Sequence, residues 1–125
     1  MSETFHTTIK ESSRELTKYE KVKLKDISSA TKLDEAVSDD GYLLIQPVAY
    51  AIVAVHNDKS DTKDYDNYVI ICADGEKYAT GSQPFWNSFK DIWDDMEGEP
   101  DWELKVYRRE SRNYKGKYFI TCALA

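Results

Sequence analysis

The chain has 125 residues, 41% of them hydrophobic and 32% charged, which is the balance of a globular protein rather than a disordered one. This length suits one domain with a single hydrophobic core. The formal net charge of −6 argues against coating of duplex DNA by bulk attraction, although it leaves room for a local basic patch. No run approaches the ~20 apolar residues of a membrane span, and no apolar stretch follows a basic N-terminus. We therefore expect a cytoplasmic protein.

The first half of the sequence contains three short predicted elements. Residues Met1 to Leu16 are polar without an apolar period, which predicts a flexible N-terminal arm or, within it, a first edge strand. Lys21 to Ile27 alternates polar and apolar residues, as in a half-exposed strand. Lys32 to Val37 is compatible with a single helical turn, and Ser38 to Gly41 with a turn of the chain.

The longest apolar run is predicted to be a bent strand. Tyr42 to Val55 is rich in β-branched residues and contains Pro47, which disfavours a helix and indicates a bend or bulge. Asn57 to Asp66 follows as a charged loop. The run thus predicts one long strand that continues past the proline.

A hairpin is predicted next. Tyr68 to Ala73 has the composition of a buried strand, and Asp74-Gly75 is a strong signal for a two-residue turn. Lys77 to Thr80 is the expected returning strand.

One longer helix is predicted, followed by two strands. Ser82 is a suitable N-cap and Pro84 falls in the first turn, where its missing N–H costs nothing. Gly98 and Pro100 end the helix. The apolar face consists of Phe85, Phe89, Ile92, Trp93 and Met96. The remaining predictions are a strand over Trp102 to Arg109, a polar turn over Glu110 to Gly116, and a last strand over Lys117 to Leu124.

The resulting β-β-β-α-β-β order is that of the OB-fold, a five-stranded and partly open barrel. The sequence therefore predicts a mostly-β fold with one main helix, in which an OB-like barrel carries an extra N-terminal strand at its edge, formed by Val22 to Ile27. Residues 17–125 would form this single domain after the arm of residues 1–16. Half-open sheets packed against one helix are the alternative.

Side chains for catalysis or metal binding are not grouped in the sequence. His6 and His56 lack Cys or His neighbours at ligand spacing, and the acidic segments 58–66 and 91–103 do not match a calcium loop. Cys72 and Cys122 have apolar neighbours, which predicts two buried free thiols, with a disulfide as the alternative. We expect no enzyme activity, no metal and no cofactor.

A basic and aromatic segment between Leu104 and Phe119 is the main functional signal. Strand alternation places Leu104 and Val106 toward the core, and therefore Lys105 and its alternate neighbours toward solvent. Cations beside exposed rings suit single-stranded nucleic acid, because bases stack on the rings while the cations follow the phosphates. The predicted binding residues are Lys105, Tyr107, Arg109, Arg112, Tyr114, Lys115, Lys117 and Phe119. A protein-binding surface and a solvated edge that resists aggregation are the alternatives.

Three segments carry a resemblance to a known family: residues 74–82, the helix with Phe85 and Phe89, and residues 111–119. Together they resemble the small single-stranded DNA-binding proteins of bacteriophages that infect Gram-positive bacteria. The resemblance implies an OB-fold, sequence-independent binding, oligomerisation, and a role with other proteins in phage DNA replication or recombination in the host cytoplasm. Many such proteins end in an acidic tail, whereas residues 120–125 here are apolar. Partner recruitment would then occur elsewhere, or the resemblance does not extend to function.

A rival hypothesis uses the acidic residues instead. The carboxylates of segments 58–66 and 91–103 could stand where DNA phosphates lie and so inhibit a host nucleic-acid enzyme. Such a mimic would not bind single-stranded DNA at any ionic strength.

Overall fold

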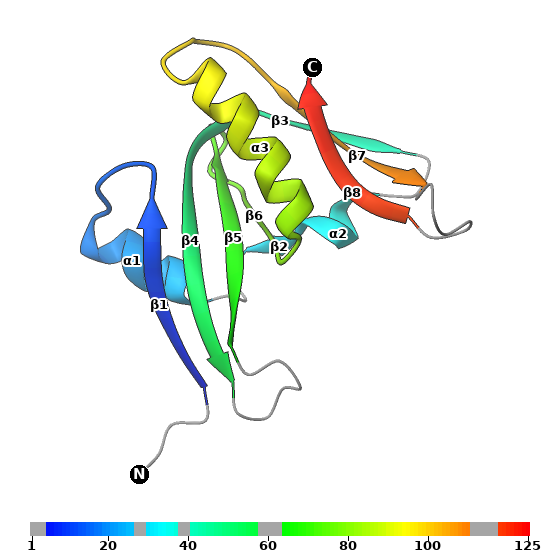
Figure 1. Cartoon of the computed structure of the whole chain (residues 1–125). Helices are drawn as coiled ribbons and strands as arrows, with labels where there is room; N and C mark the ends of the chain where they lie inside the picture. The colour runs from blue at the N-terminus through cyan, green and yellow to red at the C-terminus, as the bar shows by residue number, and fades with distance from the viewer. Residues whose placement is uncertain (1–4, 27–29, 38–40, 58–63, 111–117) are drawn as a thin grey trace. The chain divides into compact units, whose positions relative to one another are not determined.

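A computed structural model describes residues 5–26, 30–37, 41–57, 64–110 and 118–125 (Figure 1). Strands predominate in this part of the chain, which confirms a mostly-β fold, and they form two sheets without a closed barrel. The chain divides into two compact units. The first unit combines residues 1–32 with 48–81, and the second combines residues 33–47 with 82–125.

The first unit contains a five-stranded sheet. The strand order is β1 (Phe5–Ser12), β4 (Pro47–Asn57), β5 (Asp64–Cys72), β6 (Lys77–Thr80) and β2 (Thr31–Lys32). β1 runs antiparallel to β4, and β2 runs parallel to β6. β1 is thus an edge strand, which confirms the first edge strand expected within the N-terminal segment. β5 begins at Asp64, inside the segment predicted as a charged loop.

The strand predicted over Lys21–Ile27 is wrong, because its residues up to Lys25 belong to helix α1 (Lys18–Lys25); Ile27 lies outside the described residues. Thr17 caps the helix: its Oγ1 accepts from the Glu20 N–H at 3.1 Å, and Glu20 Oε1 accepts from the Thr17 N–H at 3.0 Å. Hydrogen bonds from Arg14 and from the Thr17 backbone hold the pKa of the Glu20 carboxyl at about 2. The reciprocal cap starts a helix where alternation alone suggests a strand.

Replacing Thr17 with alanine should lower the free energy of unfolding by about 0.5–2 kcal/mol, because the Glu20 N–H loses its side-chain acceptor. Urea denaturation measures this change. Thr17→Ser keeps the hydroxyl oxygen and is expected to retain most of the stability. Equal losses in the two variants would contradict the role of the cap.

Helix α1 and the five-stranded sheet enclose the core of the first unit. Leu16 and Leu24 are buried together with Ala51, Val53, Val55, Val69 and Ala79 of the sheet, and Ile9 and Ile71 pack against this cluster. α1 lies beside β1 (Figure 1). These apolar residues of the sheet are therefore covered by α1 and the segment before it.

The predicted hairpin between β5 and β6 is confirmed. Gly75 has φ +89°, which glycine adopts without strain. Its N–H donates to the Cys72 carbonyl at 3.0 Å, and Asp74 Oδ1 accepts from the Glu76 N–H at 3.0 Å. The hairpin therefore lies where the sequence predicts it. Its loop has three residues, Ala73 to Gly75, rather than two, because the Cys72 N–H still donates to the Glu76 carbonyl at 2.9 Å.

The second unit contains a three-stranded antiparallel sheet in the order β3 (Tyr42–Ile45), β7 (Leu104–Glu110) and β8 (Tyr118–Leu124). The short helix α2 (Leu33–Ala36) confirms the predicted helical turn. The bend expected at Pro47 is present, but one continuous strand over Tyr42–Val55 is wrong. Its residues form β3 and β4, which belong to different sheets, and the break falls at Gln46 beside Pro47.

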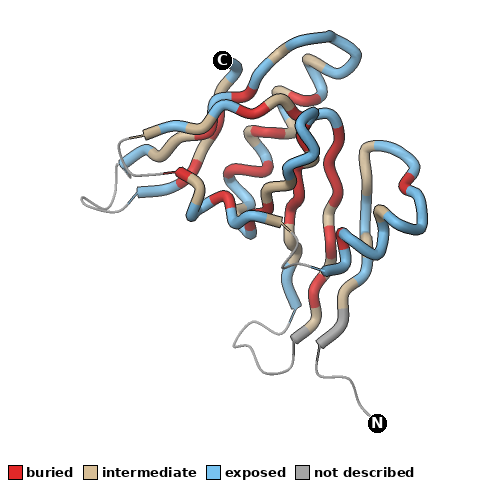
Figure 2. Tube along the Cα trace, turned by 180° about the vertical axis from the view of Figure 1, so that it is seen from behind, coloured by how far each residue is buried: buried red, intermediate tan, exposed pale blue. Residues whose placement is uncertain are grey.

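Helix α3 (Gln83–Met96) is the predicted long helix, and Ser82 Oγ accepts from the Phe85 N–H at 3.3 Å as its cap. Phe85, Phe89 and Trp93 are buried, as is Trp86, which the predicted face omits. Buried and exposed positions alternate along this helix (Figure 2), and α3 lies against β8. The helix therefore covers part of one face of the three-stranded sheet.

Candidate nucleic-acid interface

The register of the three-stranded sheet assigns its side chains to two faces. Directly paired residues of antiparallel strands point to the same side, and successive residues alternate. Leu43 pairs with Val106, and Val106 with Cys122; Ile45 pairs with Leu104. These residues share the face on which α3 packs, and Val106 and Leu104 have no exposed surface. We call this the covered face.

The opposite face, which we call the open face, carries aromatic rings and cations. Tyr42 of β3 pairs with Tyr107 of β7, and Arg109 of β7 pairs with Phe119 of β8. The side chain of Tyr42 is 63% exposed and that of Phe119 is 43% exposed. The face consists of Tyr42, Leu44, Lys105, Tyr107, Arg109, Phe119, Thr121 and Ala123. It therefore presents apolar and ring surface to solvent next to two positive charges.

Lys105 lies between two of the rings. Its Nζ is 5.0 Å from the centroid of the Tyr42 ring and 5.6 Å from that of Tyr107, within the range of cation–π attraction. These contacts place the ammonium group over the rings of Tyr42 and Tyr107. The charge and the rings thus form one continuous surface rather than separate features.

Arg108 points to the covered face and has a structural role. Its Nε donates to the Val37 carbonyl at 2.9 Å, and its Nη2 donates to the Asp34 carbonyl. These bonds tie β7 to helix α2 and to the residue that follows it. Arg108 therefore lies apart from the cations of the open face, although it is adjacent to Arg109 in the sequence.

Half of the predicted binding residues are described. Lys105 and Arg109 are exposed, Tyr107 is half-buried and Phe119 is exposed, and all four lie on the open face as strand alternation predicts. Arg112, Tyr114, Lys115 and Lys117 lie outside the described residues. Tyr42 and Leu44 belong to the face but were not predicted, because only the pairing of β3 with β7 places them there.

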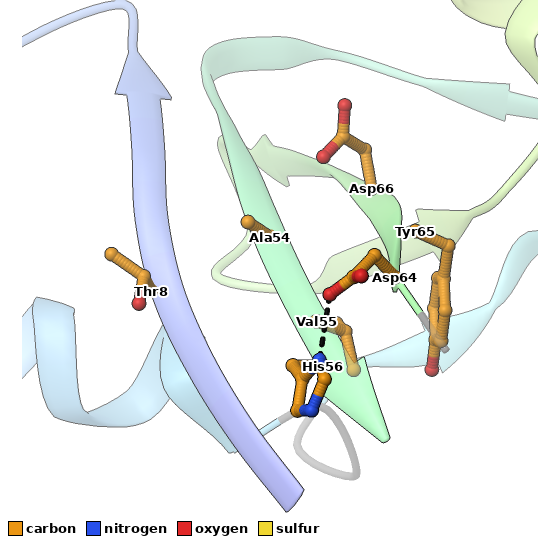
Figure 3. A pocket seen from close by; sticks show the side chains of 7 residues that line it. All are labelled: Thr8, Ala54, Val55, His56, Asp64, Tyr65 and Asp66. Atoms are coloured by element: carbon orange, nitrogen blue, oxygen red, sulfur yellow. Dashed lines mark hydrogen bonds and ion pairs between the residues drawn. The ribbon is translucent and has the colours of Figure 1, made fainter. Parts of the chain in front are cut away.

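A depression in the first unit is a weaker candidate (Figure 3). It is lined by residues of β1, β4 and β5, namely Thr8, Ala54, Val55, His56, Asp64, Tyr65 and Asp66. His56 Nδ1 lies 2.7 Å from Asp64 Oδ1, and Lys10 Nζ lies 3.1 Å from Asp66 Oδ2. Each of the two carboxylates that line the depression is thus in contact with a neighbouring basic side chain.

The two cysteine side chains lie in the interior of the protein. Cys72 and Cys122 are both free and buried, as predicted. Burial raises the pKa of each thiol to about 12, and Asp74 and Glu76 add to the rise at Cys72. Both thiols thus stay protonated and unreactive at neutral pH. Within the described residues, no three His, Cys, Asp or Glu side chains gather into a metal site.

Comparison with known proteins gives no relative for this chain: no protein-family model, no curated protein and no solved structure matches it. Among the helices of the described residues, none is both long and apolar enough to cross a bilayer. The functional proposal therefore rests on the sequence and on the geometry of the open face.

Proposed function

We propose that this protein binds single-stranded DNA without sequence specificity, through the open face of the β3–β7–β8 sheet. The observation that carries the proposal is the juxtaposition of exposed Tyr42 and Phe119 with Lys105 and Arg109 on one face. Each base stacked on a ring contributes ~1–3 kcal/mol, and every base has a face that can stack. Cations beside the rings attract the phosphates that link these bases.

A solvated edge that only resists aggregation explains this surface less well. Such an edge needs charged side chains, whereas exposed rings and aliphatic groups work against solubility. On the open face Leu44 is exposed as well as Tyr42 and Phe119. A face that combines apolar surface with cations, in a chain with a net charge of −6, favours a specific ligand of negative charge.

We further propose that the two sheets belong to an OB-like barrel. The additional N-terminal strand would be β1, in place of the segment from Lys21 that was expected to supply it and that is helical. A bent first strand that serves both sides of a barrel is what this fold requires. β3 and β4 have this relation, since they are separated by Gln46 alone, β3 pairs with β7, and β4 neighbours β5. α3 falls between β6 and β7, as in the OB order. The pairing of β6 with β8 that would close the barrel is not among those of the described residues.

The resemblance to phage proteins suggests the biological setting. On that basis we propose that the protein oligomerises and serves phage DNA replication or recombination in the host cytoplasm, together with a protein of that machinery.

Titration of a fluorescently labelled oligo-dT at several salt concentrations tests the binding. We expect saturable binding that weakens as salt rises. In Lys105→Gln/Arg109→Gln the slope of log K against log salt should fall by about 1.4, because each phosphate contact to a single strand contributes about 0.7. Binding should weaken equally for oligo-dT and oligo-dA.

Lys32→Gln/Lys90→Gln is the matched control, since it removes the same charge from one exposed and one half-buried lysine elsewhere. It should keep the slope of the unmodified protein. Absence of saturable binding at every salt concentration would overturn the proposal, and is the result expected of a DNA mimic.

A further inference from the structure

Helix α1 has an outward surface that the fold of the first unit does not use. Leu24 is its one buried residue. At 100° per residue, Tyr19 and Val22 lie on the side of the helix away from Leu24. Their side chains are 72% and 69% exposed, more than any other large hydrophobic side chain recorded for the described residues. An apolar pair this exposed needs an explanation other than packing within the unit.

Lysines border this pair. Lys18, Lys21 and Lys25 recur at steps of three and four residues, which makes one stripe next to Val22. No ion pair joins them to a carboxylate in the described residues, and like charges at this spacing repel each other. Glu20 is the only acidic residue of α1, and Arg14 binds it at 2.6 Å. No recorded ion pair of the described residues therefore neutralises the stripe.

Local helix energetics do not account for the stripe. Lysines near the end of a helix interact favourably with its dipole, which explains Lys25. Lys18 is the first residue of the helix, where the dipole disfavours a positive charge. Solvation alone would also not explain the exposed ring of Tyr19, over which Lys23 Nζ lies 5.5 Å from the centroid.

We propose that α1 is a second contact surface for single-stranded DNA, in which the lysine stripe follows the phosphates and Tyr19 stacks on a base. This inference rests on the proposed function, and it assigns a further part of the chain to the same ligand. The surface repeats the chemistry of the open face: a cation held over an exposed tyrosine, with aliphatic surface alongside.

A nucleic-acid strand suits this surface better than a protein does. A stable protein interface buries about 800 Å² on each partner. An eight-residue helix is about 12 Å long and offers Tyr19 and Val22 as its apolar contacts, which is too little for such an interface. A flexible polyanion needs only a few phosphate contacts and one ring.

The test compares Lys18→Gln/Lys21→Gln/Lys25→Gln with the unmodified protein in titrations of labelled 40-nucleotide oligo-dT. The slope of log K against log salt should fall by about 2, since three phosphate contacts of about 0.7 each are lost, and affinity at low salt should drop roughly tenfold. Glutamine is a good helix former, so α1 should persist. Lys32→Gln/Lys77→Gln/Lys90→Gln removes the same charge elsewhere and should leave the slope unchanged.

Photocrosslinking to oligo-dT that contains 5-iododeoxyuridine gives a readout that does not depend on substitution. We expect a crosslinked peptide that contains Tyr19. If binding persists but the α1 variant behaves like its control and no crosslink forms at Tyr19, the inference is overturned and the proposed function stands. A variant that changes sedimentation but not affinity for DNA would also overturn it, in favour of contact between copies. If the unmodified protein binds no DNA, the proposed function itself is wrong.

Discussion

Phe119→Ala is expected to weaken binding of single-stranded DNA by roughly 5- to 150-fold, the equivalent of about 1–3 kcal/mol for one stacked base. Phe119 lies on the open face directly opposite Arg109, so a base on its ring would have its phosphate near a cation. The loss should be similar at low and high salt, because stacking does not release counterions. Fluorescence titration with labelled oligo-dT at two salt concentrations measures both the loss and its salt dependence.

Tyr118→Ala supplies a closely matched control. Tyr118 precedes Phe119 in β8 and is also 43% exposed, but alternation directs it to the other side of the strand. Its removal should change affinity far less than that of Phe119. Equal losses in the two variants would show that exposure of a ring near the end of β8, rather than its position on the open face, matters for binding. Urea denaturation of both variants verifies that they are folded.

The alternation of β7 and β8 could be predicted from the sequence because it is local. Leu104 and Val106 are both fully buried, as their positions in an alternating run predict, and this fixes the side to which Lys105 and Arg109 point. Tyr42 could not be added to the site in the same way. It is distant from Tyr107 in the sequence, and only the pairing of β3 with β7 makes them neighbours.

Two predictions are wrong for the same physical reason. Each was made from one local sequence pattern, whereas a different interaction determines the structure. The alternation Lys-Val-Lys-Leu-Lys fits a strand, but the cap formed by Thr17 and Glu20 starts a helix, in which Val22 and Leu24 point in different directions. Pro47 predicts a bend in the apolar run, but this local pattern does not show that the strand ends there and that β3 and β4 enter different sheets. A capping-box pattern, Thr17 followed by Glu20, was present in the sequence and could have identified α1.

Arg108 shows the limit of composition as a guide to a binding site. The sequence places it within a basic cluster, next to Arg109. In the structure its guanidinium group is hydrogen-bonded to the carbonyls of Asp34 and Val37, a contact between segments far apart in the chain. Two adjacent arginines thus have different roles because successive strand residues point to opposite faces.

Phe89→Ala should lower the free energy of unfolding by about 3–5 kcal/mol, a large part of the ~5–15 kcal/mol that stabilises a typical domain. The ring has no exposed surface, and its centroid lies 4.9 Å from that of Trp86 and 5.9 Å from that of Trp93. Its removal takes away buried apolar area and leaves a cavity between two large rings. Urea denaturation followed by tryptophan fluorescence measures the loss, and both of these tryptophans report on the site.

Phe89→Ala also tests whether the core beneath β8 affects DNA binding at the open face. α3 lies against β8, and the other side of β8 carries Phe119. Because α3 and Phe119 lie on opposite sides of β8, Phe89→Ala leaves the open face itself unchanged. DNA binding should therefore fall only as far as the folded fraction falls, and a stabilising osmolyte such as TMAO should restore it. Asp91→Ala, at an exposed position of α3, should change stability by no more than about 0.5 kcal/mol. If Phe89→Ala cost no more than Asp91→Ala, the aromatic core would not be what holds α3 in the second unit.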